Sequence, residues 1–210
     1  MHVVTLSVAQ LVERAHGLAE QGTRQLLGIT GAPGAGKSTV AAAVVDALGP
    51  RLCALVPMDG FHLANATLIA WGRRDRKGAW DTFDADGYVH LLRRLRDQAE
   101  EYVHAPDFDR DVEESIGSAR PVHRDVPLIV TEGNYLLAAE GGWPQVAGLL
   151  DETWYLDVDP ALRRDRLVRR HEAHGKTHAE AEAWTDGSDE ANALLIAPTR
   201  ARADLVVTLR

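Results

Sequence analysis

One short segment restricts the fold of this chain more than any other. Residues 31–38 have the sequence GAPGAGKS, which fits the pattern G-x-x-x-x-G-K-[ST]. An apolar run over 25–30 precedes the segment, and a helical pattern over 37–48 follows it. A strand, a glycine-rich turn and a helix in this order form a loop whose backbone N–H groups wrap a phosphate. The pattern therefore predicts a P-loop, and a glycine-rich turn without a ligand is the disfavoured alternative.

Each residue type in this loop has a physical role. Small side chains let successive N–H groups turn toward one point. Lys37 supplies a flexible cation for the β- and γ-phosphates of a nucleotide, and Ser38 supplies a hydroxyl group for Mg²⁺. The helix that begins near Lys37 adds the positive end of its dipole. The predicted nucleotide contacts are Gly31, Ala32, Pro33, Gly34, Ala35, Gly36, Lys37, Ser38 and Thr39.

The rest of the pattern favours an α/β fold with a parallel sheet, because strand-like and helix-like segments alternate. Further strands are predicted over 52–58, 127–131, 153–158 and 203–209, with a less clear one over 102–107. Helices are predicted over 7–21, 37–48, 61–71, 87–101, 161–171, 177–184 and 189–196. Residues 73–84 and 112–124 are polar and are expected to be irregular. We expect a P-loop NTPase three-layer sandwich with about five strands, in a single domain over 1–210.

Composition narrows the classes of partner. The 210 residues include 23 Lys and Arg and 31 Asp and Glu, a net charge of −8, so nucleic acid and anionic membranes are not expected partners. No apolar run reaches the roughly 20 residues that span a bilayer, and the N-terminal residues lack the pattern of a signal peptide. Cys53, the one cysteine, is expected to be a buried core residue in a reducing cytoplasm.

Two acidic residues follow predicted strands. Glu132 ends the strand over 127–131, and Asp59 follows the strand over 52–58. Ligands of parallel sheets bind at the carboxyl ends of the strands, so both acids are expected beside the P-loop. Glu132 is expected to hold Mg²⁺ in preference to capping a turn. Asp59 is equally suited to take a proton from an attacking hydroxyl group, to cap the next helix or to help bind metal.

The motifs together resemble a known family. The P-loop, the segment MDGFH at 58–62 and the segment EGNY at 132–135 are similar to the phosphoribulokinase / uridine kinase / pantothenate kinase family. Within it, the chain resembles a bacterial branch described as nucleoside kinase-like or as fructose-transport-associated. The resemblance implies a phosphotransferase that uses ATP and Mg²⁺, with Asp59 as the catalytic base and Glu132 as the second acid.

The resemblance leaves the phosphate acceptor open. We identify neither the tyrosine-rich pocket of uridine kinases nor the aromatic tunnel of pantothenate kinases. Family members contact the acceptor between the base and the next helix, where Arg73, Arg74, Arg76 and Lys77 could hold an anion or form a solvated basic loop. The candidate acceptor contacts are His62, Arg76, Lys77, Asp109, Arg110, Asn134 and Tyr135.

A basic helix after the fourth strand is expected to form a lid over 161–187. Arg163, Arg166 and Arg170 share one helical face, where like charges repel unless an anion neutralises them. We expect Arg166 and Arg170 to stabilise the transferring phosphoryl group, and Arg169 to contact the nucleotide. Gly175 would allow hinge motion. A surface helix paired with its own acids is the alternative.

Two other functions compete with a small-molecule kinase. A guanine-specific switch would carry N-K-x-D after a later strand, and this motif is missing from the sequence. A nucleotide-binding regulator without turnover stays possible, although the combination of Lys37, Ser38, Asp59 and Glu132 favours catalysis. A homodimer is compatible with the sequence. We expect transfer of the γ-phosphoryl group of ATP to a hydroxyl group of a metabolite.

Overall fold

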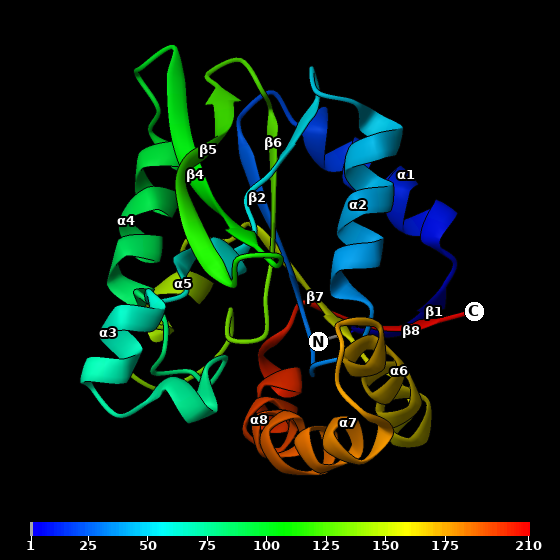
Figure 1. Ribbon diagram of the computed structural model, residues 1–210. Coiled ribbons are helices and arrows are strands. Elements are labelled where there is room, and N and C mark those ends of the chain that lie inside the picture. The colour runs from blue at the N-terminus through cyan, green and yellow to red at the C-terminus, as the bar shows by residue number, and fades with distance from the viewer. Residues whose placement is uncertain (1) are drawn as a thin grey trace.

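The computed structural model describes residues 2–210 and is built on a sheet of six parallel strands (Figure 1). The order across the sheet is β1-β8-β7-β2-β6-β3. The strands are β1 His2–Leu6, β8 Leu205–Leu209, β7 Glu152–Leu156, β2 Gln25–Thr30, β6 Leu128–Glu132 and β3 Cys53–Leu55. The expected parallel α/β sheet is confirmed, but the expectation of about five strands missed β1, which pairs with β8 at one edge.

Helices cover both faces of the sheet, as expected for three layers (Figure 1). Side chains alternate between the two faces of a strand. Leu128 and Val130 of β6 therefore pack with α1 Val8–Ala19 and α2 Lys37–Leu48, whereas Ile129 packs with α4 Ala85–Arg96 and α5 Pro144–Ala147. Cys53 is buried in the first of these two cores, as predicted. The strands are the wall between two separate hydrophobic cores.

The segment after β3 is more broken than predicted. A 3₁₀ turn over Met58–Phe61 and the short helix α3 Asn65–Ala70 replace the single helix expected over 61–71. A second 3₁₀ turn, Arg74–Arg76, lies inside the expected loop. These turns bring the chain from the end of β3 across the carboxyl edge of the sheet and back to α4.

A β-hairpin stands beside the main sheet, where an irregular segment was expected over 112–124. Its strands are β4 Tyr102–Asp109 and β5 Glu114–His123, paired antiparallel. The expectation of an irregular segment is wrong because β5 has one buried residue and, within residues 2–210, pairs with no strand other than β4. Such a strand carries few of the apolar residues by which a buried strand is predicted.

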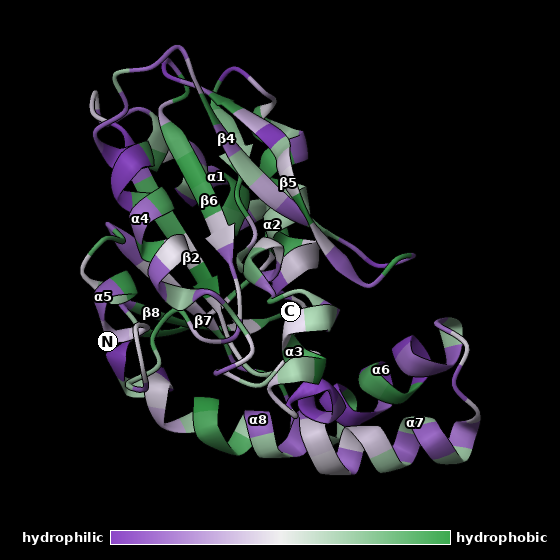
Figure 2. Ribbon diagram, turned by 60° about the vertical axis from the view of Figure 1, so that its left-hand side comes forward, coloured by the Kyte–Doolittle hydropathy of each residue, from purple (hydrophilic) through white to green (hydrophobic). Residues whose placement is uncertain are grey.

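The last helices lie at the edge of the sheet where α2 begins (Figure 1). They are α6 Pro160–Ala173, α7 His178–Trp184 and α8 Glu190–Ile196, with a π-helical turn over Thr185–Asp189 before α8. Asp159 caps α6 by accepting hydrogen bonds from the N–H groups of Ala161 and Leu162. Figure 2 shows that α6 and α7 are largely hydrophilic, unlike the central strands β2 and β6. None of the helices within residues 2–210 combines the length and apolar character that crossing a bilayer requires.

Candidate active site

The P-loop lies between β2 and α2, and its glycines have the backbone geometry that the motif requires. Gly34 has φ +81° and Gly36 has φ +94°, a region that favours glycine. A Cβ atom on Gly34 would lie 2.9 Å from Cγ of Leu167, so the loop also packs closely on α6. No side chain caps the N-terminus of α2. Its first N–H groups are therefore available to an anion, which fits a bound phosphate.

Lys37 is buried at the base of this loop. Its Nζ atom donates hydrogen bonds to the carbonyl oxygens of Gly31 and Ala32, both at 3.0 Å. Burial lowers the pKa of Lys37 to about 8, while the nearby charges of Glu132 and Asp59 act in the opposite direction. Within residues 2–210 no carboxylate lies within ion-pair distance of the Lys37 ammonium group. The site therefore fits a ligand that brings negative charge.

Ser38 and Glu132 form the part of the site that suits a cation. Glu132 is the last residue of β6 and is paired in register with Ile29 on β2, just before the P-loop. Its Oε1 atom accepts a hydrogen bond from the Ser38 hydroxyl group at 2.9 Å. Burial and the charge of Asp59 raise the pKa of Glu132. A hydroxyl group and a carboxylate beside a phosphate loop are ligands that Mg²⁺ accepts together with phosphate oxygens.

Asp59 enters the same cavity from the 3₁₀ turn after β3. Its Oδ2 atom forms an ion pair with Nη2 of Arg110 at a distance of 3.2 Å. Arg110 belongs to the turn of the β4–β5 hairpin. The cavity has a volume of about 440 Å³ and is lined by Lys37, Ser38, Asp59 and Glu132 together. Three neighbouring strand ends, those of β2, β6 and β3, thus supply the loop and both acids.

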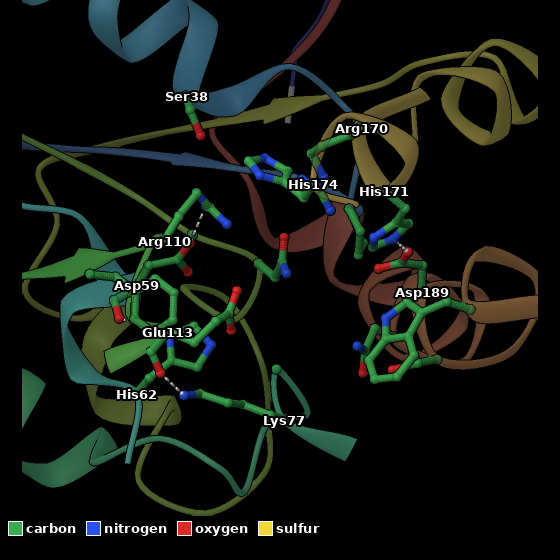
Figure 3. Close-up of a pocket in the computed structure, with 18 of the residues that line it drawn as sticks. Ser38, Asp59, His62, Lys77, Arg110, Glu113, Arg170, His171, His174 and Asp189 are labelled. Atoms are coloured by element: carbon green, nitrogen blue, oxygen red, sulfur yellow. Dashed lines mark hydrogen bonds and ion pairs between the residues drawn. The ribbon is translucent and has the colours of Figure 1, made fainter. Parts of the chain in front are cut away.

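Aromatic rings form the wall beyond Asp59. His62 packs on Phe83 and Phe108, with ring centroids 4.0 and 4.6 Å apart. Burial lowers the pKa of His62, so its imidazole ring is uncharged near neutral pH. Its Nδ1 atom lies 2.8 Å from the carbonyl oxygen of Asp59. In Figure 3, His62 lies at the end of the cavity away from Ser38.

Residues of α6, α7 and the π-helical turn line the other side of the cavity, in the segment for which a lid was predicted. Arg170 lines the cavity, and His171 and Asp189 form a pair at 2.7 Å that joins α6 to the π-helical turn (Figure 3). The ammonium group of Lys176 lies 4.7 Å from the centre of the Trp184 ring. His171, Lys176, Trp184 and Asp189 were not among the predicted site residues, because no local pattern distinguishes them from other residues of polar helices.

Three predicted acceptor contacts have other partners in the structure. Arg76 pairs with Asp81, with Nη2 at 2.7 Å from Oδ2. The carboxylate of Asp109 accepts hydrogen bonds from backbone N–H groups of its own hairpin turn. Tyr135 is fully buried, and its hydroxyl group donates to the carbonyl oxygen of Gly78 at 2.7 Å. The other predicted acceptor contacts line the cavity, namely His62, Lys77, Arg110 and Asn134.

The predicted lid arginines also separate. Arg170 lines the cavity, and Arg166 lies beside the P-loop, with Nη1 3.8 Å from where a Cβ on Gly36 would stand. Arg169 is exposed and pairs with Asp165 at 2.9 Å. Arg163 is buried against the P-loop, where Glu190 pairs with it. Only part of the predicted basic face is thus directed at the phosphate site.

Comparisons with known proteins identify the family to which the chain is similar. The model of the Phosphoribulokinase / Uridine kinase family matches residues 26–209. The chain is 31% identical over 211 residues to a Schizosaccharomyces pombe protein named "Putative uridine kinase", covering 96% of this chain and 90% of that protein. It is 28% identical over 215 residues to the "Pantothenate kinase" of Leifsonia xyli, covering 89% and 66% of the two chains. The crystal structure of a "putative fructose transport system kinase" from Silicibacter sp. TM1040 has a TM-score of 0.83 and 38% identity, covering 96% and 98%.

Proposed function

The chain belongs to the phosphoribulokinase / uridine kinase family, and we propose that it transfers the γ-phosphoryl group of Mg-ATP to a hydroxyl group of a small metabolite. One observation carries the proposal. The ammonium group of Lys37, the Ser38–Glu132 pair and the carboxylate of Asp59 all line one cavity at the ends of three adjacent strands. Phosphoryl transfer requires a phosphate-binding site, a metal-ion site and a catalytic base.

The P-loop side of the cavity would hold the nucleotide. The uncapped N–H groups of α2 and the Lys37 ammonium group bind the β- and γ-phosphates. Ser38 and Glu132 would hold Mg²⁺, which when bound neutralises charge on the phosphate oxygens. Arg170 and Arg166 stabilise the negative charge on the transferring group.

Asp59 is the base in this proposal. As the acceptor hydroxyl oxygen forms its bond to the γ-phosphorus atom, the bond from that atom to the ADP oxygen breaks, and the hydroxyl proton moves to the Asp59 carboxylate. Arg110, which contacts Oδ2 of Asp59, keeps that carboxylate oriented. The aromatic wall at His62 and Phe108 excludes water on the acceptor side.

A coupled assay of ADP release with Mg-ATP tests the proposal. The acceptors to screen are uridine, pantothenate, fructose and ribose, with the phosphates and carboxylates of these sugars. We expect release of ADP with one class of acceptor. Asp59→Asn should lower turnover by about 100-fold or more while ATP affinity stays nearly constant, because the loss is confined to proton transfer. Lys37→Ala should instead weaken ATP binding.

The competing functions give different results in the same experiment. Tight ATP binding without ADP release for any acceptor would indicate a nucleotide-binding regulator. Turnover of GTP without an acceptor would indicate a GTPase-like switch. A loss of less than about tenfold in Asp59→Asn would contradict the role of Asp59 as the base.

A further inference from the structure

The end of the cavity beyond Asp59 carries two positive charges that form no ion pair within residues 2–210. Arg74 lines this end, and its guanidinium group makes no hydrogen bond or ion pair with any residue of the described range 2–210. The neighbouring arginines do not share this property, since Arg73 and Arg76 both pair with Asp81. Asp81 is thus paired with the two arginines that lie outside the cavity, and Asp75, the neighbour of Arg74 in the sequence, does not line the cavity.

Lys77 is the second of these charges, and it is held in place by uncharged groups. Its Nζ atom donates to Oδ1 of Asn65 at 2.8 Å and to the carbonyl oxygen of Glu113 at 2.5 Å. It also lies 5.1 Å from the centre of the Phe108 ring. Burial lowers the pKa of Lys77, and the positive charge of Arg74 acts in the same direction, whereas the negative charges of Glu114 and Glu113 act in the opposite direction. The two cations are therefore close enough to repel each other.

The acids near this end are mostly engaged elsewhere. Glu114 accepts two hydrogen bonds from the backbone N–H group of Asn65, and Asp59 is paired with Arg110. Glu113 also lines the cavity, where Figure 3 draws its side chain between Asp59 and Lys77. A carboxylate in this position accepts hydrogen bonds from hydroxyl groups. The end of the cavity thus offers two cations and one acid to a ligand.

A line of contacts joins these cations to the base. The carbonyl oxygen of Asp59 contacts His62, and the His62 ring packs on Phe108. The Lys77 ammonium group lies 5.1 Å from the centre of the same Phe108 ring. In Figure 3, Asp59 lies between Ser38 at one end of the cavity and Lys77 at the other. A small molecule whose hydroxyl group faces Asp59 therefore extends its far end toward Lys77 and Arg74.

We propose that the acceptor alcohol carries an anionic group, a carboxylate or a phosphate ester, which Arg74 and Lys77 bind while a hydroxyl group faces Asp59. Guanidinium and ammonium groups bind such oxygens by charge-assisted hydrogen bonds. Glu113 then accepts hydrogen bonds from further hydroxyl groups of the acceptor. This inference rests on the proposed kinase function, because it names the class of acceptor for the same site.

The test uses two series of polyols and sugars of similar size, each with one neutral member, one carboxylate and one phosphate ester. Ribose, ribonate and ribose 5-phosphate form one series, and glycerol, glycerate and glycerol 3-phosphate form another. Each compound is titrated calorimetrically into the protein saturated with Mg²⁺ and a non-hydrolysable ATP analogue, and each is also assayed for ADP release. We expect the carboxylate or the phosphate member of a series to bind at least about tenfold more tightly than its neutral member. Whichever member binds more tightly identifies the source of the anionic group.

Variants of arginine make the test specific. Arg74→Gln should weaken binding of the anionic member by about tenfold or more and leave the neutral member unchanged, whereas Arg74→Lys should retain part of the preference. Arg51→Gln is the matched control, because it removes the same charge from an exposed residue that lies outside the cavity. Since the Arg74 guanidinium group has no partner in residues 2–210, Arg74→Gln should keep the thermal stability of the parent protein.

Two results would overturn the inference. One is equal binding of neutral and anionic members in both series, and the other is a preference for anions that Arg74→Gln and Arg51→Gln reduce equally. Rapid ADP release with a neutral acceptor would keep the kinase function and reject the anionic acceptor. Failure to bind the ATP analogue would reject the kinase function, and titration of the same series into the nucleotide-free protein and its Arg74→Gln variant would still decide the anion site.

Discussion

The hydroxyl group of Ser38 donates a hydrogen bond to Oε1 of Glu132 at 2.9 Å, across 94 positions of sequence. This contact joins the first turn of α2 to the end of β6. It also brings a neutral oxygen and a buried carboxylate to one point beside the P-loop. Burial raises the pKa of Glu132, which means that the ionised carboxylate is destabilised there. A bound cation would offset this destabilisation.

We predict that Glu132→Gln raises the Mg²⁺ concentration needed for half-maximal turnover by about 10- to 100-fold, because it removes one negative charge from the cation site. Turnover measured against Mg²⁺ concentration at fixed ATP gives this value. Glu13→Gln, at an exposed position of α1, is the control with the same change of charge. An unchanged Mg²⁺ requirement in Glu132→Gln would show that Glu132 does not serve the metal.

Arg170→Ala and Arg169→Ala separate the lid hypothesis from a surface helix. Arg170 lines the cavity, so its loss should lower kcat by about 100-fold with a smaller change in KM. Arg169 is exposed and pairs with Asp165, so its loss should cost less turnover. Steady-state kinetics of the two variants checks this order. The reverse order would favour the nucleotide contact that the sequence predicted for Arg169.

Gly34→Ala should destabilise the protein by about 1–2 kcal/mol, because a left-handed backbone is unfavourable for alanine. Its Cβ atom would also press on Leu167 and on the carbonyl oxygen of Arg163, at 2.9 and 3.0 Å. Urea unfolding measures the free energy of unfolding. Gly187→Ala is the matched variant, since its Cβ atom would meet nothing within 4 Å. Equal stability of the two variants would contradict the close packing of the loop on α6.

The thiol group of Cys53 should resist labelling by Ellman's reagent at pH 8 until the protein is unfolded. Burial raises the pKa of this thiol to about 12. Above about pH 9 the thiol loses its proton in the unfolded state but keeps it in the folded state. The contribution of Cys53 to the free energy of unfolding therefore falls as the pH rises toward 12. Unfolding at several alkaline pH values, with Cys53→Ala for comparison, measures that fall. Rapid labelling of the folded protein would contradict burial.

The P-loop and the strand-end acids were predictable because their signals are local. A glycine-rich turn between an apolar strand and a helix needs no tertiary information, and neither does an acid directly after a buried strand. The placement of Glu132 beside Ser38 then follows from the parallel register of β6 with β2. Resemblance to a family added the order of the motifs along the chain.

Elements held by distant partners were not predictable in the same way. β1 pairs with β8 from the opposite end of the chain, and most of its residues are exposed. β5 depends on β4 and has almost no buried residues of its own. Their strand structure comes from partners that the local pattern does not reveal.

The finer parts of the site depend on the same distant contacts. Asp189 faces the cavity because the π-helical turn places it against His171. Arg110 reaches Asp59 because the hairpin folds over the end of β3. Arg73 and Arg76 form ion pairs with Asp81, whereas Arg74 lines the cavity. The sequence alone does not show this difference, because the basic residues of this segment are similar to one another.

The close approach of Gly34 to α6 limits which part of the predicted lid is free to move. Arg163 and Leu167 press directly on the phosphate loop, so the first half of α6 is part of the fixed wall of the site. Gly175 has φ +89° and open space around it, just after the end of the same helix. We therefore expect release of a bound nucleotide to depend on movement of the chain beyond Ala173, while the first half of α6 stays against the P-loop.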